Sequence, residues 1–189
     1  TILDFTWVLA GPFATRILGD MGAYIIKVER YKDGTNERHL PLRITHNGVT
    51  QSSYNLNCNR GKKSICINLK NPRGMELIHE LIRKSDVLIE NFAPGVMDRL
   101  KLDYESVKKV NPGIIYVVLA SMGMDGPYKN FVMYGRPQVY VSGLAEVTGY
   151  LDGPPLSVLS WGDPVAAHHG AFALLAALRH RKKTGLGQF

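Results

Sequence analysis

The chain has 189 residues, of which 45% are hydrophobic and 21% are charged, so it can bury a core of its own. Lys and Arg number 23 against 16 Asp and Glu, and the formal net charge of +7 suits a polyanion, whether nucleic acid, a membrane surface or a phosphorylated small molecule. No apolar run approaches the ~20 residues of a bilayer-spanning helix. Two cysteines, Cys58 and Cys66, are too few for a disulfide framework or a four-ligand zinc site. The first residues lack the pattern of a signal peptide, so we expect a reducing, cytoplasmic compartment.

Both ends of the chain fall inside patterned sequence. The chain opens at Thr1 within an apolar, strand-like run and stops at Gly187-Gln188-Phe189. Because a natural domain usually carries a polar fringe at its ends, we expect this chain to be a piece of a longer protein.

The first 30 residues predict a compact strand–helix–strand unit. Apolar residues 2–8 form a strand that ends at Ala10-Gly11-Pro12, and a helical pattern follows with Pro12 in its first turn. Gly22 ends that helix, and residues 24–29 have the pattern of the next strand. The polar stretch that follows, residues 30–51, is expected to be a long surface loop.

The rest of the chain alternates between strands and helices. A predicted helix begins at Pro72, with Asn71 as its N-cap, and a long final helix is dense in Ala and Gly, which permits close packing. Such alternation favours an α/β fold, with a mostly parallel, Rossmann-like sheet and helices on both faces. The remaining predicted strands cover residues 64–68, 86–90 and 114–119, and the remaining helices cover 94–100, 104–110 and 163–182.

Three segments at predicted strand ends carry candidate binding groups. Residues 7–12 lead into a helix N-terminus and offer backbone N–H groups to an anion, although an ordinary tight turn is the simpler explanation. The basic segment 59–63 forms either a phosphate clamp or a solvated loop. Asn91 and Phe92 suit a purine, through an amide hydrogen bond and ring stacking, or else they punctuate a loop in which Asn91 caps its own turn.

Asp163 is the sharpest catalytic candidate. An Asp just before a Pro that starts a long helix is first of all an N-cap. The same carboxylate, behind Gly162, could instead act as a nucleophile or a base, although a capping carboxylate has its lone pairs occupied. His168 and His169 are adjacent, so they point in different directions, and we expect both at helix packing positions rather than on a metal.

The order of these motifs resembles the class III CoA-transferases, the group that includes formyl-CoA and carnitine CoA-transferases. Each motif is weak alone, but the ordered series is specific and runs essentially from end to end. The matching motifs are Leu3-Asp4-Phe5-Thr6, Ala10-Gly11-Pro12, Gly19-Asp20-Met21-Gly22-Ala23, Ile26-Lys27-Val28-Glu29-Arg30, Asn59-Arg60-Gly61-Lys62-Lys63-Ser64, Glu90-Asn91-Phe92-Ala93-Pro94-Gly95, Asn111-Pro112, Gly123-Met124-Asp125-Gly126-Pro127 and Thr184-Gly185-Leu186-Gly187-Gln188.

The resemblance implies that CoA moves from an acyl-CoA thioester to a free carboxylic acid. Asp163 matches the family's catalytic aspartate, which passes through aspartyl anhydride and aspartyl-CoA thioester intermediates. Acyl-CoA is then a substrate, with no permanently bound cofactor and no metal. The family's CoA-binding positions fall on Leu9, Ala10, Arg30, Leu69, Lys70, Asn91, Phe92, Arg99 and Tyr134.

The resemblance also implies how the chain is organised. Residues 1–189 match the N-terminal part of the large CoA-binding and catalytic domain of an interlocked homodimer, and the remainder of the enzyme is absent from the chain. We therefore expect residues 1–189 alone to be inactive. Partners other than an acyl-CoA and an acid, such as nucleic acid or a membrane, are not expected.

Two alternatives remain open from the sequence. The first is a 2-methylacyl-CoA racemase of the same fold, which needs a His in a Gly-His-Asp motif where this chain has Met133-Tyr134-Gly135. The second is a basic, non-catalytic binding module, although an RNA-binding signature and an aromatic stacking platform are both missing. The Asp that many family members carry after the tyrosine is also missing at Gly135. Trp7, Tyr134 and Trp161 predict an aromatic-lined acyl pocket.

Overall fold

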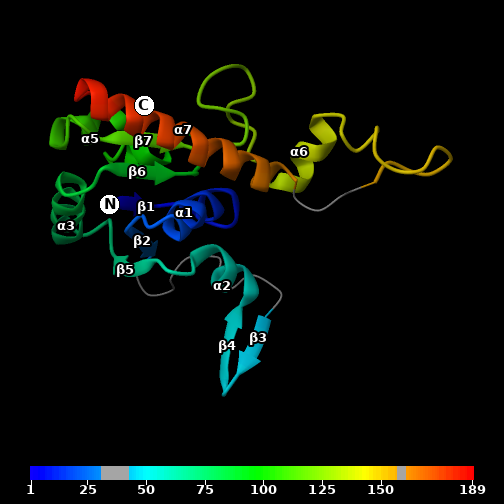
Figure 1. Cartoon of the computed structure of the whole chain (residues 1–189), viewed down its shortest axis with the longest axis horizontal. Coiled ribbons are helices and arrows are strands. Elements are labelled where there is room, and N and C mark those ends of the chain that lie inside the picture. The colour runs from blue at the N-terminus through cyan, green and yellow to red at the C-terminus, as the bar shows by residue number, and fades with distance from the viewer. Residues whose placement is uncertain (31–42, 157–160) are drawn as a thin grey trace.

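A parallel sheet forms the centre of the protein. The computed structural model describes residues 1–30, 43–156 and 161–189 (Figure 1). Its five-stranded sheet has the order β5–β2–β1–β6–β7, and every neighbouring pair of strands is parallel. All five carboxyl ends therefore lie at one edge, which confirms the predicted α/β fold with a mostly parallel sheet. The strands are β1 (Ile2–Asp4), β2 (Ile25–Arg30), β5 (Lys63–Ile67), β6 (Val87–Glu90) and β7 (Ile115–Val118).

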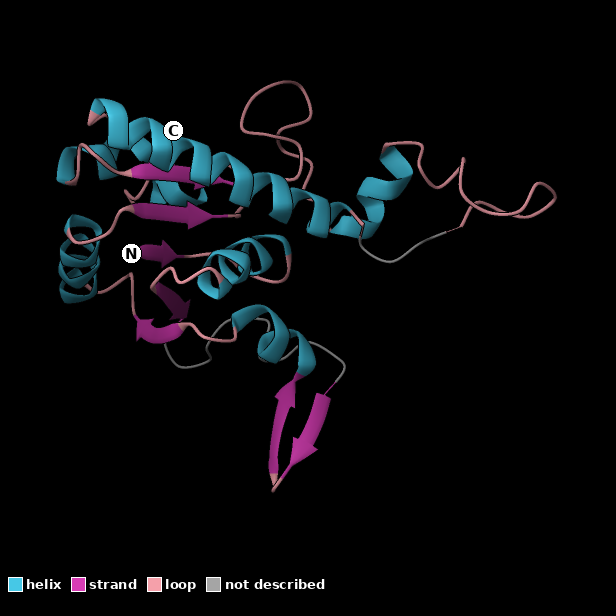
Figure 2. Ribbon diagram, viewed as in Figure 1, coloured by secondary structure: helices cyan, strands magenta, loops and turns pink. Residues whose placement is uncertain are grey.

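Helices cover both faces of the sheet, as expected (Figure 2). Successive strand residues alternate between the faces, so Val87 and Ile89 pack on one side of β6 and Leu88 packs on the other. One face is covered by α1 (Ala10–Asp20) and α7 (Gly162–Thr184). The opposite face is covered by α3 (Pro72–Arg83), α4 (Val96–Arg99) and α5 (Tyr104–Val110). Of these, α3 has the expected N-cap, because Asn71 Oδ1 accepts a hydrogen bond of 2.9 Å from the Arg73 N–H.

Small residues let α7 approach the sheet and α1 closely. Ala167, Gly170 and Ala171 are buried in this contact. A Cβ at Gly170 would lie 2.8 Å from Leu119 Cδ2, so only glycine fits there without a shift. The predicted helix at 163–182 is therefore present, slightly longer, and it ends at Gly185 with a left-handed φ of 76°.

The predicted surface loop at 30–51 is partly wrong. A hairpin forms from β3 (Arg43–His46) and β4 (Val49–Ser52), and α2 (Ser53–Asn59) follows it. Asn47 and Gly48 form the connecting turn with φ of 49° and 75°, and two positive φ values are what a tight two-residue hairpin turn requires. The Asn-Gly pair was the signal for this hairpin. Residues 31–42 of the predicted loop lie outside the described residues.

Two further boundaries bear on the site. The apolar run at 2–8 forms only a three-residue strand, and α1 begins at Ala10 with Pro12 in its first turn, as expected. An additional helix, α6 (Gly135–Val141), was not predicted; with residues 142–156 it extends away from the sheet, and we call residues 135–156 the α6 arm (Figure 1). No helix among the described residues is long and apolar enough to cross a membrane.

Candidate active site

Asp163 lies in the first turn of α7, where three helix N-termini come together. Its Oδ2 accepts a hydrogen bond of 3.1 Å from the N–H of Gly135, the first residue of α6. The backbone N–H of Ala10, the first residue of α1, lies near enough to the carboxylate to lower its pKa. The expected N-cap role is wrong, because α7 begins at Gly162 and has no side-chain cap. One residue inside the helix, the carboxylate is free to accept donors from the other two helices.

Burial and hydrogen bonding act on the Asp163 carboxyl in opposite directions. Burial raises its pKa above the usual value, and the N–H groups of Gly135 and Ala10 offset only part of that rise. A carboxylate that is poorly hydrated and more basic than usual is a better nucleophile once it is ionised. The two N–H groups also face the position where negative charge changes during attack by the carboxylate.

Asp163 opens into a cavity of about 650 Å³ at the carboxyl edge of the sheet. Open α/β sheets bind ligands at this edge. The cavity wall combines the loop after β1, the loop after β6, the end of β7, the segment before α6, and one face of α7. Its lining residues are Trp7, Val8, Leu9, Ala10, Asn91, Phe92, Ala93, Pro94, Val117, Val118, Leu119, Ala120, Ser121, Lys129, Phe131, Val132, Met133, Tyr134, Gln138, Asp163, Ala166, His169, Gly170 and Ala173.

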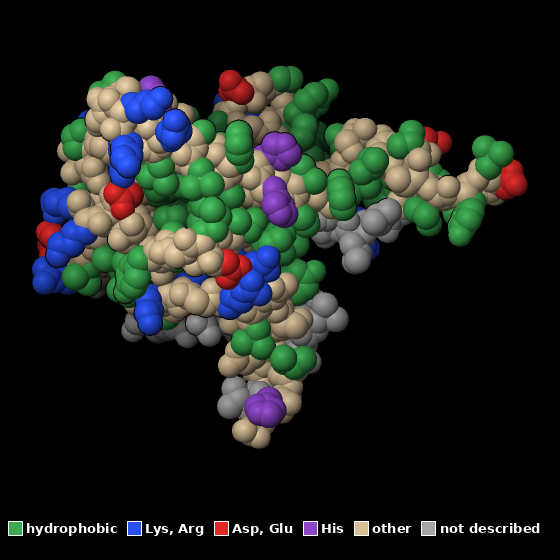
Figure 3. All heavy atoms as spheres, viewed as in Figure 1, with side chains coloured by type: hydrophobic (Ala, Val, Ile, Leu, Met, Phe, Trp, Pro, Cys, Tyr) green, Lys and Arg blue, Asp and Glu red, His purple; other side chains and the backbone are tan. Residues whose placement is uncertain are grey.

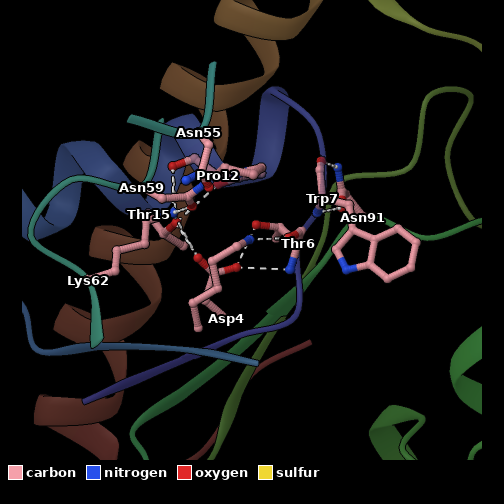
Figure 4. Close-up of polar contacts among 11 residues, drawn as sticks. Asp4, Thr6, Trp7, Pro12, Thr15, Asn55, Asn59, Lys62 and Asn91 are labelled. Atoms are coloured by element: carbon pink, nitrogen blue, oxygen red, sulfur yellow. Dashed lines mark hydrogen bonds and ion pairs between the residues drawn. The ribbon is translucent and has the colours of Figure 1, made fainter. Parts of the chain in front are cut away.

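The loop of residues 7–10, which joins β1 to α1, is clamped by Asn91. Asn91 Oδ1 accepts a hydrogen bond of 2.7 Å from the Trp7 N–H, and Asn91 Nδ2 donates one of 2.8 Å to the Trp7 carbonyl (Figure 4). The Phe92 ring meets the Trp7 ring edge-on, with centroids 5.3 Å apart. Asn91 thus holds a neighbouring loop rather than capping its own turn, and its amide is engaged there instead of standing free for a purine.

Five of the predicted CoA-binding residues lie on the cavity with Asp163. They are Leu9, Ala10, Asn91, Phe92 and Tyr134. Of the three aromatic residues expected to line an acyl pocket, Trp7 and Tyr134 do so, whereas Trp161 is 56% exposed and is not among the lining residues.

The other four predicted residues do not line this cavity. Arg30 ends β2, with its guanidinium carbon 5.9 Å from the centre of the Trp7 ring. Leu69 and Lys70 lie between β5 and α3, where Leu69 packs against the core and Lys70 is exposed. Arg99 ends α4 and is exposed. All four follow the carboxyl ends of strands, so they share the sheet edge with the cavity but stand outside it.

Two cations of the basic segment 59–63 are already paired in the structure. Arg60 bonds Asp20, with 2.6 Å between Nη2 and Oδ2. Lys62 is buried against Asp4, with 3.0 Å between Nζ and Oδ2. Both cations therefore already have carboxylate partners.

Sequence reasoning missed His169 as a cavity residue. Both histidines are exposed, but the His168 ring packs edge-on against Phe13 with centroids 5.4 Å apart. Each ring nitrogen Nδ1 lies within hydrogen-bond distance of a backbone carbonyl four residues earlier. His169 lines the cavity with Asp163. Helix periodicity brings positions 163, 166, 170 and 173 to one face of α7, and His169 lies at the border of that face, which is the signal that could have found it. The described residues contain no group of three or more His, Cys, Asp or Glu able to hold a metal ion.

Comparison with known proteins shows the family to which the chain belongs. The family model of CoA-transferase family III matches residues 1–189, and the chain therefore belongs to that family. It is 40% identical over 189 residues to the succinyl-CoA:glutarate CoA-transferase of Mus musculus, and 38% identical over 188 residues to the formyl-CoA:oxalate CoA-transferase of Escherichia coli. These alignments cover 100% and 99% of this chain but 43% and 44% of the relatives, so the chain spans less than half their length.

Solved structures share this fold. A CAIB/BAIF family protein from Brucella suis superposes with a TM-score of 0.93 at 35% identity, covering 99% of this chain and 50% of that one. A hypothetical protein from Mycobacterium tuberculosis superposes with a TM-score of 0.88 at 31% identity, covering 99% of this chain and 51% of its own.

Proposed function

We propose that the protein transfers CoA from an acyl-CoA thioester to a free carboxylic acid, with Asp163 as the nucleophile. The observation that carries the proposal is the Asp163 carboxylate itself. It is partly buried on the cavity at the carboxyl edge of the sheet, accepts a hydrogen bond from the Gly135 N–H, and has its pKa lowered by the nearby Ala10 N–H. Two relatives named as CoA-transferases, each more than a third identical, support the reaction class.

The reaction proceeds through four exchanges at carbonyl carbon. The Asp163 carboxylate attacks the thioester carbonyl, the C–S bond breaks, and CoA departs as the thiolate. A mixed anhydride of Asp163 and the donor acyl group remains. The thiolate then attacks the Asp163 carbonyl and releases the donor acid, leaving an aspartyl-CoA thioester. The acceptor carboxylate attacks that thioester, again expelling thiolate and forming a second anhydride. Thiolate attack on the acceptor acyl carbon yields the new acyl-CoA and restores Asp163.

The chain supplies two kinds of group for these steps. The N–H groups of Ala10 and Gly135 stabilise the Asp163 carboxylate when it is the leaving group and orient it when it attacks. In this proposal Leu9, Phe92 and Tyr134 line the path of the thioester toward Asp163, and Trp7 adds an aromatic wall beside it.

The residues outside the cavity suit the distant end of CoA. Arg30, Lys70 and Arg99 are cations at the same sheet edge, and in this proposal they meet the CoA phosphates, which explains part of the net charge of +7. Leu69 accompanies Lys70 in the turn before α3. No permanently bound cofactor takes part, because CoA enters and leaves as a substrate.

The proposal extends to the organisation of the whole protein. Residues 1–189 are proposed to be the N-terminal part of its large CoA-binding and catalytic domain, acting in the cytoplasm as an interlocked homodimer. The spans of 43% and 44% of the two CoA-transferases leave room for the rest of such a domain. Activity is therefore expected of the full-length protein and not of residues 1–189 alone.

Intermediate trapping tests this function. The full-length protein is incubated with succinyl-CoA and glutarate, or with formyl-CoA and oxalate, then quenched with hydroxylamine and mapped by mass spectrometry. A hydroxamate at Asp163 and CoA transfer to the acid are expected. Asp163→Asn should lose transfer by roughly 10³-fold or more, since the nucleophile is removed.

The matched control is Asp152→Asn, which removes an exposed carboxylate on the α6 arm and should leave transfer unchanged. Transfer and trapping that persist in Asp163→Asn would contradict the nucleophile assignment. Exchange of an α-proton of a 2-methylacyl-CoA without any acceptor acid would instead identify the racemase.

A further inference from the structure

A buried ion pair lies directly beneath the loop of residues 7–10. Asp4 ends β1 and is fully buried, and the Lys62 side chain is 2% exposed. Lys62 Nζ lies 3.0 Å from Asp4 Oδ2 (Figure 4). Neither group reaches the cavity, so neither takes part in the chemistry proposed for Asp163.

The pair ties down both ends of the loop. Before the loop, Thr6 donates its backbone N–H, at 2.9 Å, and its hydroxyl to Asp4 Oδ1. After the loop, Lys62 Nζ donates a bond of 3.0 Å to the Pro12 carbonyl in the first turn of α1. Thr15, one turn further along α1, donates a bond of 2.7 Å to Asp4 Oδ2. A second lysine, Lys27, bonds the Thr6 carbonyl at 2.6 Å.

Between these anchoring hydrogen bonds, the loop has a strained backbone conformation. Val8 has a φ of 69°, in the left-handed region that a β-branched residue rarely occupies. A Cβ at Gly11 would lie 2.3 Å from Thr6 Cβ, so the strand end and the helix start touch directly. Strained backbone of this kind persists only where its surroundings over-determine it, and it is concentrated at functional sites.

A contribution to folding stability does not by itself explain why the protein has a buried ion pair here. Taking two charges out of water costs free energy that their attraction only partly returns, and apolar residues of similar volume often serve as well. Here burial would raise the pKa of Asp4, yet Lys62, Lys27 and the Thr6 and Thr15 hydroxyls together hold it at about 2. The carboxylate is therefore ionised throughout the neutral range and keeps accepting all of its hydrogen bonds.

We propose that Asp4 and Lys62 are positioning residues, which fix the backbone of residues 7–10 so that the Ala10 N–H meets the Asp163 carboxylate. This inference rests on the proposed function. Asp4 anchors Thr6 and α1, Lys62 anchors Pro12, and the loop between carries the Ala10 N–H to Asp163 while Asn91 steadies its middle. The pair thus acts on the reaction through backbone geometry.

The double variant Asp4→Asn/Lys62→Met separates positioning from stability. It removes both charges of the ion pair at once, so neither Asp4 nor Lys62 leaves the other buried as an unpaired charge. We expect cooperative unfolding to remain, kcat to fall roughly 10- to 100-fold, and KM for acyl-CoA to change by less than about threefold. The acid limb of the pH–kcat profile should move to higher pH, because loss of the Ala10 hydrogen bond raises the pKa of Asp163. Lys129, Tyr134 and His169, the titratable side chains that share the cavity with Asp163, are unchanged.

Two further variants keep the test decisive. Thr15→Val removes one donor to Asp4 at constant shape, and we expect the same two changes at a smaller size, about threefold in kcat. Asp86→Asn is the control: it breaks an ion pair of 2.7 Å with Arg181 just before β6, at the amino edge of the sheet, and should leave kcat and the pH profile unchanged.

The possible outcomes separate the two proposals. A folded double variant, or a folded Thr15→Val, with wild-type kcat and pH profile would overturn the positioning role. If the wild-type protein itself shows no CoA transfer and no adduct on Asp163, the proposed function fails. Wild-type transfer with an unaffected double variant overturns only this inference.

Discussion

The two backbone donors to Asp163 come from unlike regions of the molecule. The Ala10 N–H belongs to a loop that is anchored at Thr6, Trp7 and Pro12 to side chains of β1 and β2, of the residue after β6 and of the residue before β5. The Gly135 N–H belongs to the α6 arm, whose large apolar side chains are mostly in solvent (Figure 3). Val147, Tyr150 and Leu151 are 80%, 86% and 101% exposed.

Only one of the two N–H groups beside Asp163, that of Ala10, is held in place by the residues around the central sheet. The donor from the loop is fixed by contacts that exist whatever else the protein binds. The donor from the arm depends on a segment with few buried side chains, among them Val139 and Ala145. Segments with few buried apolar contacts open at lower free energy than core elements. We therefore expect substitutions in the fixed region to change stability as well as activity, and substitutions in the arm to change activity with little change in stability.

The largest gain in stability is expected at Glu90, which precedes Asn91, the residue that clamps the loop. Burial raises the pKa of Glu90 from 4.5 to about 7, the Phe92 N–H offsets part of the rise, and Asp98 adds to it. The favourable contribution of the neutral acid is fully present below about pH 4.5 and is lost as the pH rises through about 7. Glu90→Gln should therefore raise the free energy of unfolding at pH 8 by about 3 kcal/mol and change it little at pH 4.5.

Urea unfolding at the two pH values measures this effect. The control is Glu105→Gln, which removes an exposed carboxylate from the first turn of α5. If the free energy of unfolding of Glu90→Gln has the same pH dependence as that of the wild type, Glu90 is not held in its neutral form. Burial of Glu90 then does not lower the stability of the protein at pH 8.

The secondary structure around the central sheet was also easier to predict from the sequence than that of the α6 arm. Periodicity and strand–helix alternation were enough for the parallel sheet, because each strand packs on helices through alternate side chains. The Asn71 N-cap followed from local chemistry as well. The hairpin was missed although Asn47-Gly48 marked it. Helix α6 was missed because it has only seven residues, carries Pro137 in its first turn and buries only Gly135 and Val139.

Local sequence singled out Asp163, whereas the distant residues of its cavity were predicted only through the family resemblance. Asp163 stood out beside Gly162 and Pro164, but its two donors come from residues 153 and 28 positions away, and no local pattern shows such contacts. For the same reason Lys62 was interpreted as part of a solvated basic loop, whereas the fold buries it on Asp4. Long-range pairing decides both cases.

The donor from the arm can be removed without breaking its helix. Gly135 is the first residue of α6, where proline is tolerated, and the preceding Tyr134 has φ of −89° and ψ of 168°, which a residue before proline readily adopts. Gly135→Pro should lower kcat roughly 10- to 100-fold, since one charge-assisted hydrogen bond to Asp163 is lost. Stability should change little.

The matched control is Gly135→Ala, which adds a side chain but keeps the N–H. Steady-state kinetics and thermal unfolding of both variants distinguish loss of the donor from added bulk. Equal kinetics for the two variants would show that the arm donor contributes nothing, and that Ala10 alone serves Asp163.

Alanine substitutions at Gly11, beside the anchored loop, and at Gly162, beside the α6 arm, compare how easily the two regions accommodate an added methyl group. A Cβ at Gly11 would lie 2.3 Å from Thr6 Cβ, and Thr6 cannot move because Asp4 holds it. A Cβ at Gly162 would lie 1.8 Å from Gln138 Oε1, the end of a flexible side chain on the arm, which can rotate away. Gly11→Ala should lower the free energy of unfolding by about 1–3 kcal/mol, and Gly162→Ala by much less. Urea titrations give both values, and equal losses would contradict the contrast between the regions.

The smallest effect is expected at the tip of the arm. Leu151 is fully exposed, so Leu151→Gln removes almost no buried apolar surface and should change the free energy of unfolding by less than about 0.5 kcal/mol. The buried counterpart is Leu174→Ala in α7, 1% exposed, which should cost about 2–5 kcal/mol. Both are measured by urea unfolding of the full-length protein. A loss at Leu151 as large as that at Leu174 would mean that the arm is packed against another segment or chain in solution. The Gly135 donor would then be as firmly placed as that of Ala10.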